Sequence, residues 1–147
     1  MVAHPIPHLV YNASATAPLG FYSVTRHGTI SRGDLVLARL PDAARRLAAD
    51  RGYLRPDVPV VTQVAAIAGD IVCADSGIVA INNRVAARTL LTDREGRFLP
   101  AWRSCRPLTE GEIFLLNENV VASFDGRYFG PISGSALIGR LRPLWTW

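Results

Sequence analysis

The sequence contains no lysine, because all 16 of its basic residues are arginine. Both residue types serve as solvated surface charges, so this composition points to no particular function. It does have one chemical consequence, since arginine stays protonated in proteins and no neutral lysine amine can form. A lysine therefore cannot act as a general base in this chain.

Long apolar runs are also absent. The best candidate, residues 58–69, is interrupted by Pro59, Thr62 and Gln63, whereas a membrane-spanning helix needs about 20 mainly apolar residues. The first 11 residues contain two prolines and no basic cluster, which does not fit a signal peptide. The 147 residues suffice for one globular domain with a real core, and we expect the chain as given not to enter a membrane by itself.

Clustered charge is missing as well. The formal net charge is +4, but the arginines are spread along the chain without a basic tail or interleaved aromatic residues. The densest pairs are Arg45 with Arg46 and Arg140 with Arg142. We therefore expect a mildly basic, solvated surface and no nucleic-acid partner.

Apolar and β-branched residues predict the first elements. Residues 20–24 and 34–40 have strand composition between glycine or proline breaks, and we expect these two strands to pair with each other. Residues 41–52 follow with helical spacing of Ala44, Leu47 and Ala48, a proline at the start and a glycine at the end. The prediction here is a short amphipathic surface helix.

Strand signals dominate the remainder. Residues 60–74 form a long strand-like run with a turn or bulge at Gly69 and Asp70, and the pair Asn82 and Asn83 suits a two-residue hairpin. Residues 90–106 lack a period and predict mostly loop, and strands resume at 112–118 and 136–145. The predicted fold class is mainly β, an antiparallel coiled or barrel-like sheet with one short surface helix.

Three separated segments carry a resemblance. They are NASATAPLGFY at 12–22, VPVVTQVAAIAGD at 58–70 and SFDGRYFGPI at 123–132. In this order they resemble the conserved boxes of the type I signal peptidases, and in particular the conjugal transfer (TraF-type) branch. The likeness runs from Tyr11 to Trp145, so we expect an N-terminal extension at 1–10 and one signal peptidase-like domain at 11–147.

The third box is the most specific of the three. The family pattern of serine, aspartate, arginine, two aromatic residues, glycine and proline is met by Ser123, Asp125, Arg127 and the following YFGP. The preceding triplet, glycine, aspartate and asparagine in the family, is Asn-Glu-Asn at 117–119. The resemblance implies that Asp125 and Arg127 form a supporting pair and that Ser123 hydrogen-bonds the catalytic base.

The catalytic dyad of the family is a serine nucleophile and a lysine base. The matching positions here hold Thr16 and Thr62. A threonine hydroxyl can attack a carbonyl, although its β-branch crowds the approach, but a threonine cannot accept the proton near neutral pH. The resemblance thus implies a serine-type endopeptidase with both dyad positions substituted.

Other groups could in principle take part. Ser14 is an alternative nucleophile if the loop register shifts, and His27 lies in a turn where a solvated histidine is the simpler interpretation. The α-amino group of Met1 has a suitable pKa but is far from Thr16 in the sequence. No metal or other cofactor is expected.

The resemblance also implies partners and a location. Relatives process leader peptides or pilin precursors, which they bind as an added β-strand, so exported precursor peptides are the expected partners. We expect weak activity or none; the alternative is a non-catalytic domain that binds peptides or a component of the transfer apparatus. The expected location is the periplasmic face of the inner membrane, with membrane-surface association, and a cytoplasmic location stays open.

Two cysteines, Cys73 and Cys105, remain. A disulfide between them would stabilise the fold by about 3 to 4 kcal/mol and would indicate an oxidising compartment. Two buried free thiols are the alternative.

Overall fold

The computed structural model describes residues 9–12, 17–26 and 28–146. They form two antiparallel sheets, which confirms the mainly β prediction. The strands are β1 (Leu9–Asn12), β2 (Gly20–Thr25), β3 (Leu35–Ala38), β4 (Val60–Ala66), β5 (Ile71–Asp75), β6 (Ile78–Ile81), β7 (Arg84–Arg88), β8 (Ser104–Pro107), β9 (Glu112–Leu115), β10 (Ile132–Ser133) and β11 (Leu137–Thr146). The helices are α1 (Asp42–Asp50), α2 (Gly126–Phe129) and the 3-10 turn Gly134–Ala136.

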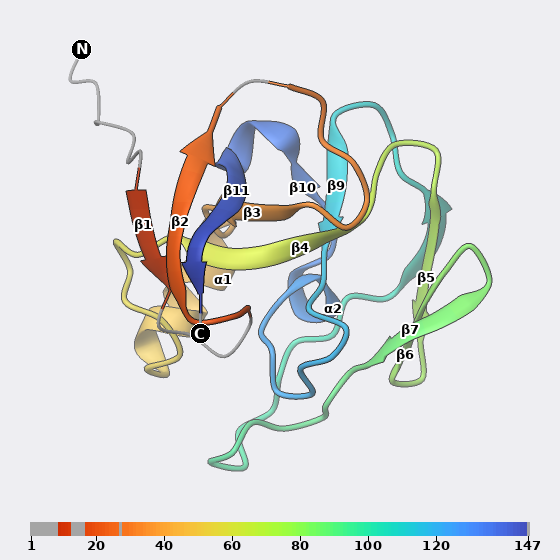
Figure 1. The fold of residues 1–147 in the computed structure, drawn as a ribbon. Helices are drawn as coiled ribbons and strands as arrows, with labels where there is room; N and C mark the ends of the chain where they lie inside the picture. The colour runs from red at the N-terminus through yellow and green to blue at the C-terminus, as the bar shows by residue number, and fades with distance from the viewer. Residues whose placement is uncertain (1–8, 13–16, 27, 147) are drawn as a thin grey trace.

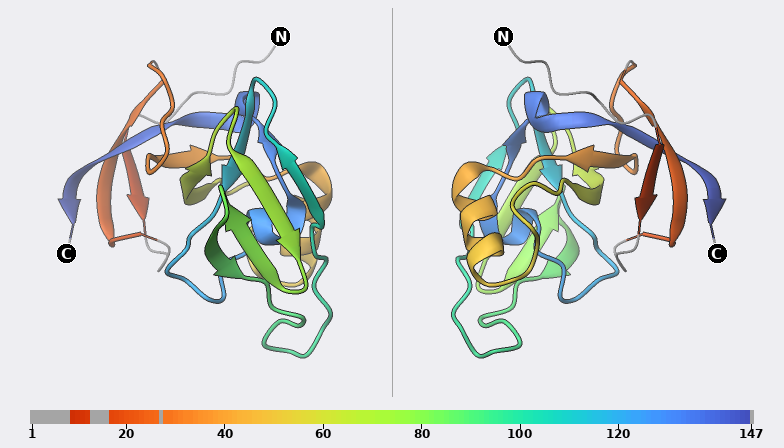
Figure 2. Two further views of the ribbon diagram at one scale, coloured as in Figure 1. Left: turned by 90° about the vertical axis from the view of Figure 1, so that its right-hand side faces the viewer. Right: turned by 90° about the vertical axis from the view of Figure 1, so that its left-hand side faces the viewer.

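The larger sheet has seven strands in the order β1-β2-β11-β3-β4-β9-β10. It curls into a half-barrel, so that β3 and β4 cross the molecule in a different direction from β2 and β9 (Figure 1). The smaller sheet has the order β7-β6-β5-β8 and lies at the far side from β1 and β2 (Figures 1 and 2). A core of buried aliphatic residues and Phe114 fills the space where β4 and β9 meet the smaller sheet.

One predicted pairing is wrong. β2 and β3 do not pair with each other, since β11 lies between them and bonds to both. The C-terminal strand β11 has ten residues. Within it, Arg140 lies opposite Thr25 of β2 on one side and Val36 of β3 on the other. A partner more than a hundred residues away in the chain therefore replaces the nearest neighbour.

The local predictions fare better. The surface helix is present as α1, which buries Ala44 and Ala48. Asn82 and Asn83 both have positive φ, 51° and 67°, as a tight hairpin between β6 and β7 requires. Residues 90–103 are largely irregular, although β8 begins at Ser104 inside the predicted loop.

The turn at Gly69 and Asp70 carries the chain from one sheet to the other, between β4 and β5. Asp70 is buried and accepts hydrogen bonds from the Ile67 amide and the Asn82 side chain. Desolvation raises the pKa of Asp70, but these two hydrogen bonds and the nearby Arg32 outweigh it and lower the pKa below the usual range. The carboxylate therefore holds the corner between the sheets in its charged form.

Within the described ranges, no helix combines the length and the apolar character that crossing a bilayer requires.

Candidate functional site

A buried ion pair lies at the centre of the third box. Arg127 Nε and Asp125 Oδ1 are 2.9 Å apart, and a second bond joins Arg127 Nη2 to Asp125 Oδ2 at 3.0 Å. Each of the two residues is only 1% exposed. Asp125 also caps α2 by accepting from the Arg127 amide. The pair predicted from the sequence is therefore present, and it is shielded from water.

Arg127 uses its remaining donors on backbone carbonyls. Its guanidinium bonds to the carbonyls of Asn117 and Val120, both at 2.9 Å, and to that of Arg88 at 3.1 Å. These carbonyls belong to the loop after β9 and to the end of β7. A buried guanidinium with its donors satisfied in this way fixes the shape of the loop at residues 117–125.

Asn117 connects this network to the second box. Its amide donates to Asp125 Oδ2 at 3.0 Å, its side-chain nitrogen donates to Ser123 Oγ at 2.9 Å, and its Oδ1 accepts from the Gln63 amide at 3.3 Å. The sequence comparison missed this role, because Asn117 stands at a position where the family pattern has glycine. A polar residue directly after the apolar run at 113–116 was the one available signal.

Ser123 accordingly has a protein partner of its own. The resemblance implied a hydrogen bond from this serine to the base, but here the side-chain amide of Asn117 bonds to its hydroxyl. The buried Ser123, Asp125 and Arg127 thus form one polar cluster, and Asn117 links this cluster to β4 at the residue next to Thr62.

Thr62, at the base position, lies in the middle of β4 opposite Val36 and is 3% exposed. Its neighbours two positions away on the same face, Val60 and Val64, belong to the same apolar cluster as Val36. Its Oγ1 is buried and has no hydrogen-bond partner among the described residues. A buried hydroxyl without a partner is uncommon and destabilising, typically by about 1 to 3 kcal/mol.

This environment would suit a neutral amine. Burial among apolar side chains disfavours the charged form of an amine and so lowers its pKa, which a lysine base requires. A threonine hydroxyl gains nothing comparable, because it has no proton-accepting form near neutral pH. The surroundings expected for the family's base are therefore present around a residue that cannot act as one.

The nucleophile candidates Thr16 and Ser14 lie outside the described residues, as does His27. The chain on either side of residues 13–16 is nevertheless well anchored. Asn12 is buried and donates its side-chain amide to the Ala17 carbonyl at 3.1 Å, and the Tyr22 hydroxyl donates to the Pro18 carbonyl at 2.6 Å. These bonds hold the two ends of the segment at one place beside β2.

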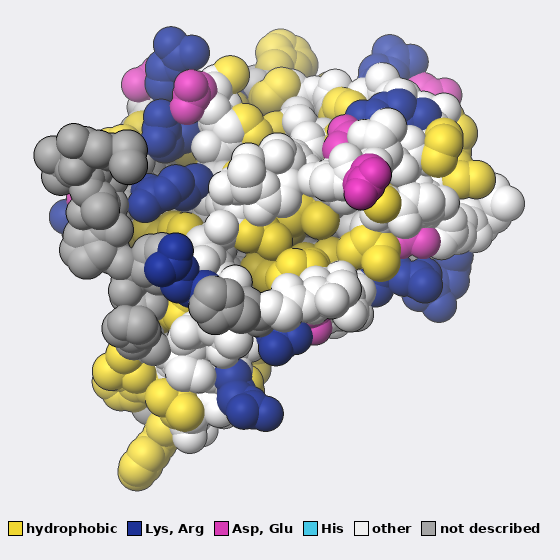
Figure 3. Space-filling view, turned by 90° about the horizontal axis from the view of Figure 1, so that it is seen from above, with side chains coloured by type: hydrophobic (Ala, Val, Ile, Leu, Met, Phe, Trp, Pro, Cys, Tyr) yellow, Lys and Arg dark blue, Asp and Glu magenta, His cyan; other side chains and the backbone are white. Residues whose placement is uncertain are grey.

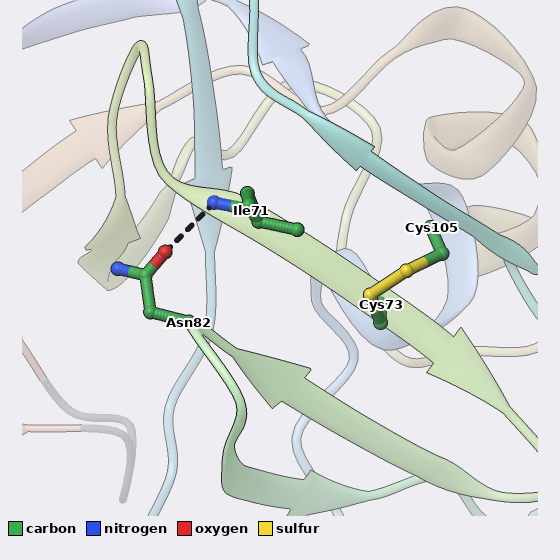
Figure 4. The surroundings of a disulfide bond; sticks show 4 residues. All are labelled: Ile71, Cys73, Asn82 and Cys105. Carbon is green, nitrogen blue, oxygen red and sulfur yellow. Dashed lines mark hydrogen bonds between the residues drawn. A yellow bond between two sulfur atoms is a disulfide. The ribbon is translucent and has the colours of Figure 1, made fainter.

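Cys73 and Cys105 form a disulfide, which decides between the two alternatives left open by the sequence. The two residues lie directly opposite each other on β5 and β8, with Cα atoms 3.9 Å apart (Figure 4). The bond ties the edge strand of the smaller sheet, and the long irregular segment before it, to the sheet centre. In the described part of the chain, no three or more histidine, cysteine or acidic residues gather as metal ligands would.

Comparison with known proteins adds the following. The family model described as signal peptidase, peptidase S26, matches residues 1–147. The chain is 34% identical over 144 residues to the conjugal transfer protein TraF of Agrobacterium fabrum, covering 92% of this chain and 81% of the relative. It is 30% identical over 146 residues to a plasmid transfer protein TraF of Escherichia coli, covering 92% and 82%. Among solved structures, a signal peptidase I from Enterococcus faecalis V583 aligns with a TM-score of 0.46 and 17% identity, over 80% of this chain and 100% of that one.

Proposed function

Because this chain belongs to the signal peptidase family, peptidase S26, we propose that it is a peptidase domain of the conjugal transfer branch that binds exported precursor peptides and cleaves them weakly or not at all. One observation carries the second half of the proposal. The position of the family's base holds Thr62, buried among apolar residues with its hydroxyl unpartnered in the described part of the chain.

The chemistry of peptide cleavage explains why this substitution matters. An alcohol attacks a peptide carbonyl only when a base removes its proton, and general-base assistance typically contributes about 10² to 10⁴-fold. Neither Thr16 nor Thr62 can supply that base, and the chain has no lysine to replace it. Without a base, the serine-type mechanism implied by the family stops before the first bond is formed.

Binding places different demands on the site. An extended peptide that joins a sheet edge is held mainly by backbone hydrogen bonds, which do not need the dyad. The supporting cluster of Ser123, Asp125 and Arg127 is buried and hydrogen-bonded although the base is missing. An intact supporting cluster without a catalytic base favours a domain that still binds leader peptides or pilin precursors. The same observation suits the alternative, a non-catalytic interaction domain of the transfer apparatus.

The direct test is to separate binding from cleavage. We expect the wild-type protein to bind fluorescein-labelled leader peptides from transfer-apparatus precursors, as measured by fluorescence anisotropy. Mass spectrometry of the same samples should show intact peptide after prolonged incubation. A scrambled peptide of equal composition serves as the control. Binding of both peptides with equal affinity, or efficient cleavage by the wild type, would contradict the proposal.

An apolar surface near the first box supports the proposed location at a membrane surface. Tyr11, Phe21 and Trp145 lie side by side on β1, β2 and β11, and their exposed fractions are 50%, 40% and 71%. Because directly opposed residues share a face, the three rings form one aromatic row. Arg142, opposite Ser23, adds a positive charge on the same face. Aromatic rings beside a basic residue suit the interface of an anionic bilayer.

We expect the double variant Phe21→Ser, Trp145→Ser to bind phosphatidylglycerol-containing vesicles at least about tenfold more weakly than the wild type, because burying one large apolar side chain contributes about 1.5 to 3 kcal/mol. Vesicle flotation measures the bound fraction. Phe98 is equally exposed, at 71%, but lies outside the aromatic row, so Phe98→Ser is the matched control. Equal losses in the double variant and the control would argue against a specific membrane face.

We do not propose nucleic acid as a partner. On the face in Figure 3, basic side chains are scattered among acidic and apolar ones and form no continuous patch. With this arrangement, and the periplasmic face of the inner membrane as the proposed location, exported peptides are the partner class that the site supports best.

A further inference from the structure

A groove of about 590 Å³ lies between β4 and the β6–β7 hairpin, where the two sheets meet. Its apolar lining comes from both sheets and consists of Val64, Ala65, Ile81, Ala86 and Leu116. Its volume lies within the roughly 300 to 1,000 Å³ that small-ligand sites occupy. It can therefore hold a short chain segment and not a folded partner.

Both walls of the groove are fixed by hydrogen bonds. On the hairpin side, Asn82 donates to Asp70 at 3.0 Å and accepts from the Ile71 amide at 2.9 Å (Figure 4). On the opposite side, the Leu116 amide donates to the Gln63 carbonyl at 3.0 Å, and Asn117 accepts from the Gln63 amide. The groove is thus a preformed feature of the fold, and no closure is needed to create it.

Three polar side chains that line the groove are unpaired within the described residues. Gln63, Arg84 and Glu118 are exposed, and no side-chain hydrogen bond or ion pair engages them within the described residues. Arg84 begins β7 on the hairpin wall, whereas Glu118 follows β9 on the other wall. One free positive charge and one free negative charge therefore stand on opposite walls, and Arg32, which pairs with Asp70 at 3.6 Å, is a second basic residue of the lining.

The backbone of β4 adds a further feature. Val64 lies opposite Leu115 and Ala66 opposite Phe114, so Ala65 is the extra residue of a β-bulge. The extra residue of a bulge is left out of the ladder, and bulges are frequent beside binding sites. Ala65 lines the groove, which places an irregular piece of main chain next to the apolar lining.

We propose that this groove binds an extended peptide segment that carries one acidic and one basic side chain on opposite faces, directed at Arg84 and Glu118 respectively. The inference rests on the proposed function, since the occupant is a second stretch of the same precursor, separate from the stretch that carries the leader cleavage site. Gln63 and Thr62 are adjacent in β4, so their side chains point to opposite faces of the sheet. The Thr62 side chain therefore points away from the face of β4 on which Gln63 lines the groove.

Strand geometry makes the charge pattern testable. In an extended peptide, side chains at odd spacing point to opposite faces and those at even spacing to the same face. We expect alanine- and serine-rich labelled peptides with Glu and Lys one or three positions apart to bind the wild type about three- to fivefold more tightly than peptides with the two residues two or four apart, the scale of one partly exposed ion pair. Fluorescence anisotropy measures the affinities.

Reversing the charges of Arg84 and Glu118 tests whether the peptide preference arises in the groove. Arg84→Glu leaves acidic residues at positions 84 and 118, with Arg32 as the one basic residue of the lining, and should favour peptides with two lysines. Glu118→Arg should favour peptides with two glutamates, and the double reversal should restore the wild-type ranking. Arg94→Glu and Glu110→Arg, exposed positions outside the groove, are the matched controls. Circular dichroism confirms that each variant is folded.

An unchanged ranking of peptides in the folded Arg84→Glu and Glu118→Arg variants would overturn the groove proposal. So would equal binding of odd- and even-spaced peptides by the wild type. Leader-peptide binding measured on the same samples separates the two ideas. If leader peptides bind while the ranking ignores charge, only the groove proposal fails; if the ranking inverts as expected but leader peptides do not bind, the proposed function fails instead.

Discussion

The double variant Thr16→Ser, Thr62→Lys is expected to cleave a transfer-type leader peptide about 10² to 10⁴-fold faster than the wild type, the usual contribution of a general base. A lysine introduced at position 62 would enter a strand centre lined by Val36, Val60 and Val64. Desolvation there lowers the pKa of the amine, so a useful fraction is neutral near the working pH. The substitution would also remove the Thr62 hydroxyl, which has no hydrogen-bond partner among the described residues.

Each single change should recover far less, because nucleophile and base act as a unit and their effects are not additive. Thr16→Ser combined with Gln63→Lys is the matched control, since it places an amine one residue away on the exposed face of the same strand. Cleavage by the active double variant should increase with pH through the pKa of the introduced lysine amine, because only the neutral amine accepts a proton. Liquid chromatography of the peptide products provides the rates.

The prediction would be contradicted if the wild type cleaved the peptide efficiently and if Ser14→Ala or His27→Ala abolished that cleavage. Such a result would identify a different nucleophile or base. Equal recovery with lysine at position 63 would show instead that the buried environment of position 62 has no special effect.

Asp125→Ala is expected to lower the free energy of unfolding by about 3 to 5 kcal/mol, the usual effect of removing one partner of a buried ion pair. The variant would leave the guanidinium of Arg127 buried without its counter-charge. It would also remove acceptors for the Asn117 and Arg127 amides. Urea denaturation followed by circular dichroism measures the loss.

The pair of Asp75 and Arg103 provides the matched comparison. Its atoms are also 2.9 Å apart, but the two side chains are 71% and 73% exposed. Asp75→Ala should therefore change stability little, although it breaks a contact of the same length. A loss below about half a kcal/mol for Asp125→Ala, on the scale of exposed pairs, would reduce Asp125 to an ordinary turn residue.

The sequence determined the features that depend on nearby residues. Helical spacing after Pro41 predicted α1, and the Asn82–Asn83 turn predicted the hairpin, because both depend on backbone preferences within a few positions. The order of the three boxes predicted the signal peptidase resemblance and the pair of Asp125 and Arg127. The absence of lysine from the composition was enough to exclude the family's base.

Only the tertiary structure decided which distant segments meet. The insertion of β11 between β2 and β3, the bonds of Asn117 to Ser123 and Gln63, and the groove between the sheets all join residues from separate parts of the chain. Strand composition shows that a segment will pair but does not name its partner, since many apolar strands satisfy the same pattern. Burial has the same origin: Thr62 is an ordinary strand residue in the sequence. Its hydroxyl is buried without a partner among the described residues because Val36, Val60 and Val64, which pack in one apolar cluster, surround its position on β4.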